Sequence, residues 1–131
     1  MPRVFLSHGA RDAKLAAAVA RALRKHGVEA FDVFESDAGA GYVRQAIKSA
    51  IRRADGFVLV LGTPETAASS WTSYELGMAE ALSKPILLML SHKHAAAELP
   101  FDLAGLPILP FDPAHPDRAA REIVDRLLAA A

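Results

Sequence analysis

The chain has 131 residues, 52% of them hydrophobic, with 15 basic and 15 acidic side chains and no cysteine. This length is usual for one domain, so we expect residues 1–131 to form a single unit built around one core. The balanced charge argues against a general nucleic-acid binder, and the absence of cysteine excludes disulfides, a thiolate nucleophile and a cysteine-ligated zinc site. We find no apolar run of the roughly 18 residues that a membrane helix needs. A strand follows Met1 too closely for a signal peptide, so we expect a cytoplasmic protein without membrane contact.

The first third of the chain alternates short strands with an amphipathic helix. Arg3 to Leu6 is a β-type run that stops at Ser7-His8-Gly9, and Asp12 is placed to cap the helix that follows. This helix carries an apolar stripe of Leu15, Val19 and Leu23, and it ends at Gly27, a residue common at helix C-termini. Residues 28–33 predict a second strand near the sheet edge, and residues 35–41 form a loop rich in glycine and acidic residues.

The alternation continues along the rest of the chain. Helical spacing over residues 43–54 precedes a nearly all-apolar strand, 57–61, of the kind that is covered on both faces. A loop over 62–70 leads to a helix over 71–82 and a strand over 86–90. Residues 91–106 are ambiguous, with a short helix near Ala95, and residues 106–109 predict a fifth strand. A loop over 110–116 and a final helix with apolar positions at 123–128 complete the chain.

Strands that alternate with helices at this spacing predict right-handed βαβ units and a parallel sheet. Five strands in a chain of this length favour a flavodoxin-like, doubly wound α/β fold with strand order 2-1-3-4-5 and helices on both faces. Ligands of such sheets bind beyond the carboxyl ends of the strands, where the winding direction reverses between strands 1 and 3. The residues that this rule selects as a candidate site are Ser7, His8, Gly9, Gly62, Thr63 and Glu75.

Three segments, in order, resemble the TIR (Toll/interleukin-1 receptor) domain, especially its bacterial members. The run Val4-Phe5-Leu6-Ser7-His8 followed by Asp12 looks like the opening strand and first loop of that family. Phe31-Asp32 and the loop to Gly41 occupy the place of its BB loop, although an Arg-Pro-Gly-like turn is replaced here by Ser-Asp-Ala-Gly-Ala-Gly over 36–41. Trp71 four residues before Glu75-Leu76 is the most specific of the three matches.

The resemblance implies an NAD+ nucleosidase. Many bacterial TIR domains cleave the nicotinamide–ribose bond of NAD+, as substrate rather than as cofactor, to release ADP-ribose or a cyclised form, and the family's essential glutamate maps onto Glu75. Such domains typically act when self-associated, so the resemblance also implies homo-oligomers and contacts with other TIR domains. Other members are non-enzymatic adaptors. Glu75-Leu76-Gly77-Met78-Ala79 followed by Lys84-Pro85 also resembles nucleoside deoxyribosyltransferases, which use a glutamate nucleophile.

Two interpretations of Glu75 compete. A carboxylate near the ribose can stabilise the oxocarbenium-like cation left when nicotinamide departs. On spacing alone, however, Thr72-x-x-Glu75 is favoured as a capping box at a helix start. The position of Glu75 at the expected switch point and the family resemblance favour the functional interpretation.

The remaining candidates carry weaker signals. Asp37 could supply a second acid, although such a residue is more often a solvated turn former. Trp71 could wall the pocket and stack on a ring, or equally pack on the core. We assign His8 no acid–base role. His92 and His94 have a spacing that could hold a metal loosely, but a third ligand is not evident, so we expect a solvated loop and no metal site.

Overall fold

The computed structural model describes residues 2–31, 40–63, 70–99, 103 and 105–128. Within these residues strands and helices alternate as β1 (Arg3–His8), α1 (Ala13–Lys25), β2 (Glu29–Phe31), α2 (Ala40–Arg53), β3 (Gly56–Leu61), α3 (Ser70–Ala81), β4 (Ile86–Ser91), β5 (Ile108–Phe111) and α4 (Pro116–Ile123). The short 3₁₀ turns η1 (Ala10–Asp12) and η3 (Ala96–Glu98) precede α1 and follow β4, and a π-helical turn, η5 (Val124–Leu128), continues α4. The η3 turn confirms the short helix expected near Ala95.

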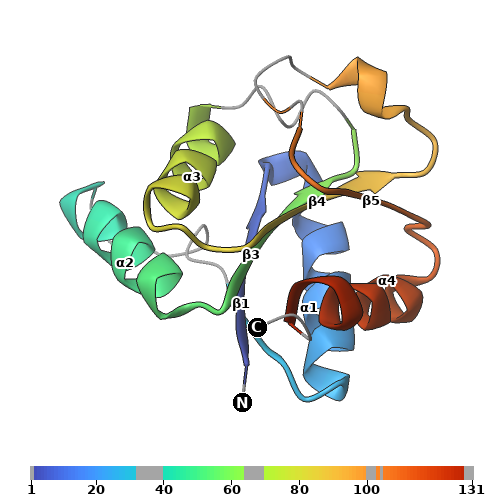
Figure 1. The fold of residues 1–131 in the computed structure, drawn as a ribbon, viewed down its shortest axis with the longest axis horizontal. Helices are drawn as coiled ribbons and strands as arrows, with labels where there is room; N and C mark the ends of the chain where they lie inside the picture. The colour runs from blue at the N-terminus through green and yellow to red at the C-terminus, as the bar shows by residue number, and fades with distance from the viewer. Residues whose placement is uncertain (1, 32–39, 64–69, 100–102, 104, 129–131) are drawn as a thin grey trace.

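The five strands form one sheet of order β2-β1-β3-β4-β5, and every adjacent pair is parallel. Helices α2 and α3 cover one face of this sheet, and α1 and α4 cover the other (Figure 1). The chain moves outward from β1 to β2 and then crosses back past β1 to β3, so the winding direction reverses between β1 and β3. The predicted flavodoxin-like, doubly wound fold is therefore confirmed.

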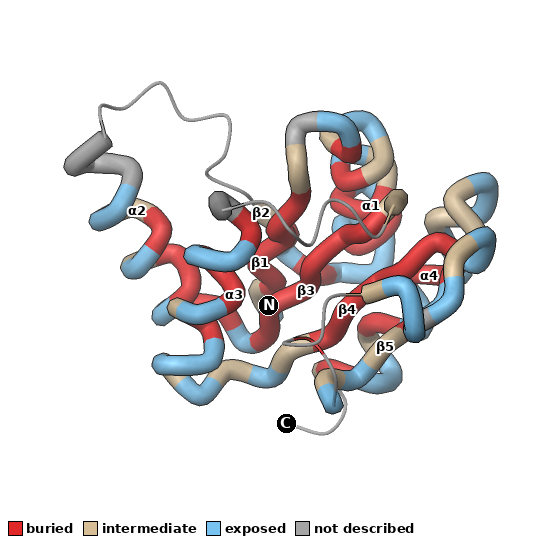
Figure 2. Tube along the Cα trace, turned by 90° about the horizontal axis from the view of Figure 1, so that it is seen from above, coloured by how far each residue is buried: buried red, intermediate tan, exposed pale blue. Residues whose placement is uncertain are grey.

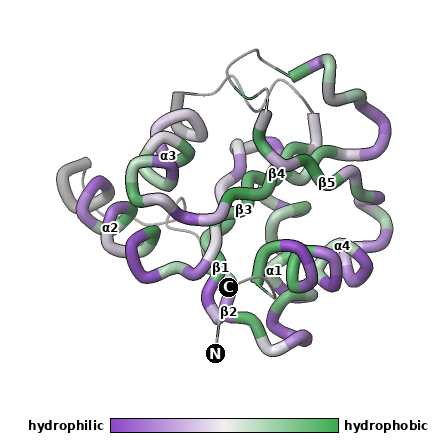
Figure 3. The backbone as a smooth tube through the Cα atoms, in the orientation of Figure 1, coloured by the Kyte–Doolittle hydropathy of each residue, from purple (hydrophilic) through white to green (hydrophobic). Residues whose placement is uncertain are grey.

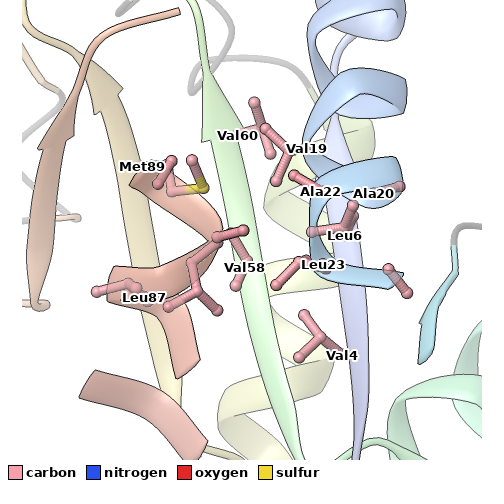
Figure 4. Close-up of a cluster of buried hydrophobic side chains, with 14 of the residues drawn as sticks. Val4, Leu6, Val19, Ala20, Ala22, Leu23, Val58, Val60, Leu87 and Met89 are labelled. Carbon is pink, nitrogen blue, oxygen red and sulfur yellow. The ribbon is translucent and has the colours of Figure 1, made fainter. Parts of the chain in front are cut away.

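Side-chain alternation along the strands divides the hydrophobic core into two clusters. Val4 and Leu6 of β1 pack with Val58 and Val60 of β3 against α1 and α4 (Figure 4). Phe5 of β1 belongs to the second cluster, which packs against α2 and α3 and contains Phe57, Leu59, Ile47, Ile51, Leu76 and Ala79. An odd-numbered position of β1 therefore faces α2 and α3, and an even-numbered one faces α1.

The central strands β3 and β4 are buried almost throughout (Figure 2) and are hydrophobic along their lengths (Figure 3). Burial of one large apolar side chain contributes roughly 1.5–3 kcal/mol relative to leaving it exposed. Because helices cover both faces of these strands, each residue contributes to the core whichever way it points. This explains why the sequence of β3 shows no polar alternation.

The predicted bounds of several elements differ from the observed ones, and three of these differences affect the site or the sheet edge. The fifth strand was expected over 106–109, but β5 spans Ile108–Phe111 and includes Pro110, which stands opposite Leu90. Pro110 is tolerated because β5 pairs with β4 alone and lies at the sheet edge, where a missing N–H costs little. Helix α2 begins at Ala40, inside the predicted loop. Strand β1 extends to His8, so Ser7 and His8 lie on the strand rather than after it.

Candidate functional site

Buried polar side chains gather toward the carboxyl edge of the sheet. Among the described residues, the buried polar or charged side chains lie at the carboxyl ends of strands or in the turns and helices that follow them: Ser7, His8, Asp12, Thr72, Glu75 and Ser91. Polar groups in a core cost free energy unless they are hydrogen-bonded. Their concentration at this edge of the sheet therefore indicates a candidate functional site. Two of these groups, Ser7 and Glu75, meet directly.

The contact between Ser7 and Glu75 joins β1 to α3. Ser7 lies two residues after Phe5 on β1, so its side chain points to the same face of the sheet, toward α2 and α3. Its hydroxyl donates to Glu75 Oε1 at 2.6 Å, across 68 residues of sequence. Both residues have 0% exposure.

Glu75 occupies a core-facing position of α3. The buried residues of this helix recur with helical spacing at Thr72, Glu75, Leu76 and Ala79, so the carboxylate stands where an amphipathic helix would place an apolar side chain. Glutamate is almost never fully buried in proteins without a specific partner, and a carboxylate retained at a core position is a functional-site candidate.

The observed start of α3 does not match the capping-box interpretation of Glu75. A capping box requires Thr72 at the N-cap and Glu75 three residues into the helix. Helix α3 begins at Ser70, so Thr72 is already its third residue and Glu75 lies in its second turn. The sequence pattern is the same in both cases, which is why spacing alone could not separate them.

The structure does not bring His8 to Glu75. His8 points to the same face of β1 as Leu6, toward α1. There it lines a groove of about 350 Å³ with Leu6, Arg21 and Phe31. Its Nδ1 lies 2.8 Å from the carbonyl oxygen of Gly9. The adjacent residues Ser7 and His8 therefore serve opposite faces of the sheet, because successive side chains of a strand alternate.

Asp12 connects the two strand ends that flank the switch point. It stands at the N-cap of α1, as expected, but its carboxylate reaches across to accept the backbone N–H of Gly62 at 3.2 Å. A Cβ atom at Gly62 would overlap Asp12 Oδ1, so a larger residue here would displace the Asp12 carboxylate. The backbone N–H of Asp12 donates to the carbonyl of Gly9 at 3.0 Å. Gly9, Gly62 and Thr63 are half-buried at this edge.

Sequence reasoning missed both links, Ser7 to Glu75 and Asp12 to Gly62. A serine in an otherwise apolar strand was the available signal for the first. The second had only the glycine itself as a signal. Of the other candidates, Asp37 lies outside the described residues. The backbone of Trp71 is in the first turn of α3, and its side chain lies outside the described part of the molecule.

The histidines that follow β4 make separate local contacts. His92 Nδ1 lies 3.0 Å from the carbonyl oxygen of Phe111, and His94 Nδ1 lies 3.3 Å from Glu98 Oε2. In the described part of the chain, we find no group of three histidine or acidic side chains that could hold a metal ion. In those same residues, no helix is long and apolar enough to cross a membrane.

Comparison with known families gives one decisive match. The family model of the TIR domain matches residues 4–128, nearly the whole chain. The chain belongs to the TIR domain family. No curated protein sequence matches the chain.

Solved structures similar to this chain include a TIR domain and two enzymes that act on nucleosides or nucleotides. The TIR domain of the Toll-related receptor TRR-2 from Hydra magnipapillata is 19% identical, with a TM-score of 0.69 and coverage of 97% of this chain and 94% of that one. The CMP N-glycosidase BcmB from Clostridium botulinum is 20% identical, with a TM-score of 0.63 and coverage of 92% and 97%. A 2-deoxyribosyltransferase from Leishmania mexicana is 20% identical, with a TM-score of 0.66 and coverage of 96% and 99%. At these identities the likeness establishes a shared fold.

Proposed function

We propose that this TIR domain cleaves the nicotinamide–ribose bond of NAD+, with Glu75 as the key carboxylate. The observation that carries the proposal is the buried hydrogen bond between Glu75 and Ser7 beside the point where the sheet reverses its winding. A structural carboxylate would gain more from solvent than from a core position, whereas a catalytic one gains from a site that excludes water.

The chemistry requires little beyond one carboxylate. Nicotinamide leaves as a neutral molecule when its bond to C1′ of the ribose breaks, so its departure needs no proton. The cation that develops on the ribose is stabilised by the negative charge of Glu75. Water then adds to C1′ and releases a proton, which gives ADP-ribose, nicotinamide and H⁺ from NAD+ and water. In the cyclising variant, a nitrogen of the adenine attacks C1′ in place of water.

A second candidate activity is transfer or hydrolysis at the N-glycosidic bond of a nucleoside or nucleoside monophosphate. The presence of a CMP N-glycosidase and a 2-deoxyribosyltransferase among proteins of this fold favours it. Cleavage of NAD+, hydrolysis of CMP and deoxyribosyl transfer all pass through a similar ribosyl cation. A buried carboxylate can therefore stabilise the transition state of each reaction. The third candidate, a non-enzymatic adaptor, is favoured by the TIR domain of a receptor with the same fold.

A substrate panel separates these candidates. We would incubate the protein in separate reactions with NAD+, with CMP and with a pair of deoxynucleosides. The products of each reaction would be separated by chromatography. The proposal predicts nicotinamide from NAD+ and no cytosine from CMP, with turnover lost in Glu75→Gln. Cytosine release or base exchange would assign the nucleotide or deoxynucleoside activity instead. Absence of turnover on all substrates, in protein demonstrated to be assembled, would support the adaptor.

A further inference from the structure

The hydroxyl of Ser7 occupies a position that the core would otherwise fill with an apolar side chain. Ser7 lies next to Leu6 on β1 and opposite Leu59 of β3, and on its own face of the strand the preceding residue is Phe5. Burial of a hydroxyl costs free energy unless it is hydrogen-bonded. Here the compensating bond is made to Glu75 Oε1 at 2.6 Å.

This bond restricts Glu75. It fixes the position of one carboxylate oxygen relative to β1, and therefore relative to the carboxyl edge of the sheet where a ligand would lie. A rigid strand supplies the donor, so the geometry does not depend on a loop.

We propose that Ser7 is a positioning residue for Glu75: its hydroxyl holds the carboxylate in the orientation that stabilises the ribosyl cation. This inference rests on the proposed function of Glu75. It changes the expectation for Ser7 from a group that lines the substrate pocket to a group that acts through the carboxylate.

The charged groups on the elements that pack against α3 bear on any pH-dependent test. Strand β3 carries none, and β1 carries Arg3, which pairs with Glu29, and His8, which faces α1. The cationic side chains of α2 are exposed and comprise Arg44, Lys48, Arg52 and Arg53. These groups are common to all variants below, so a difference between pH profiles reports the substitution at Ser7.

The test compares Ser7→Ala with Ser7→Thr, which keeps the hydroxyl, and with Ser91→Ala. Ser91 is a matched control because it is a buried serine at the carboxyl end of β4. The measurements are kcat and KM for nicotinamide release as a function of pH, with folding of each variant checked by circular dichroism and thermal unfolding.

For Ser7→Ala we expect kcat to fall about 10- to 100-fold, the effect of losing one hydrogen bond to a charged group. We expect KM to change less than about twofold, because orientation acts in the transition state rather than in binding. Ser7→Thr and Ser91→Ala should stay near wild type.

Two outcomes overturn the inference while the proposed function stands. In the first, Ser7→Ala keeps the kcat and pH profile of an active wild type. In the second, Ser91→Ala loses as much activity as Ser7→Ala, which would make the effect one of packing. An inactive wild type overturns the proposed function itself and the inference with it.

Discussion

At the scale of single residues, Glu75 illustrates how a spacing pattern can mislead. Thr72-x-x-Glu75 predicts a helix cap equally well whether the helix begins at Thr72 or two residues earlier. The observed start at Ser70 moves both side chains onto the buried stripe of α3. Helix starts are the least certain part of a sequence-based prediction, because several caps compete within a turn. The switch-point rule, which depends on strand order alone, selected Glu75, and the structure places this residue beside β1 through its contact with Ser7.

The burial of Glu75 leads to a prediction about stability. Glu75→Gln removes a charge from the core and keeps an oxygen that can accept from Ser7. Because the buried charge is costly, we expect the free energy of unfolding at pH 7 to stay within about 1 kcal/mol of wild type or to rise. Urea denaturation of wild type and Glu75→Gln measures this free energy of unfolding. A loss of about 3 kcal/mol or more would mean that the carboxylate is a structural partner whose removal breaks a buried network.

At the scale of elements, the hydrogen bond between Gly62 and Asp12 joins the end of β3 to the start of α1 beside the switch point. We expect Gly62→Ala to destabilise the protein by about 1–3 kcal/mol, because the added Cβ displaces the Asp12 carboxylate from the Gly62 N–H.

Gly77→Ala provides the control for this substitution. Gly77 is exposed in the middle of α3, with open space where a Cβ would lie, and alanine there should stabilise the helix by about 0.5–1 kcal/mol. Thermal unfolding of both variants tests the pair. Equal stability of Gly62→Ala and wild type would show that the Asp12 link does not hold the strand ends together.

At the scale of the whole molecule, the alternation of apolar runs and helical stripes predicted the sheet order and the distribution of helices correctly. Apolar periodicity reports burial, and burial decides which layers form. The periodicity could not predict that Ser7 and His8 diverge, because the observed strand is longer than its apolar run. Nor could it predict the bounds of β5, because Pro110 resembles a loop residue until its edge position is known.

Assembly is the second whole-molecule question. The family resemblance implies an activity that depends on self-association, so we expect the rate of nicotinamide release per molecule to rise with protein concentration and with a crowding agent. Sedimentation over the same concentration range would report the oligomers. A rate per molecule that stays constant while the oligomer content changes would contradict this dependence and assign the activity to single subunits.

The central claim is that Glu75 cleaves NAD+, and it is tested most directly by nicotinamide release in Glu75→Gln and Glu80→Gln. Both substitutions neutralise a glutamate of α3, but Glu80 is exposed whereas Glu75 is buried. We predict that Glu80→Gln releases nicotinamide at the wild-type rate and that Glu75→Gln releases none above background. Equal release by wild type and Glu75→Gln would contradict the claim.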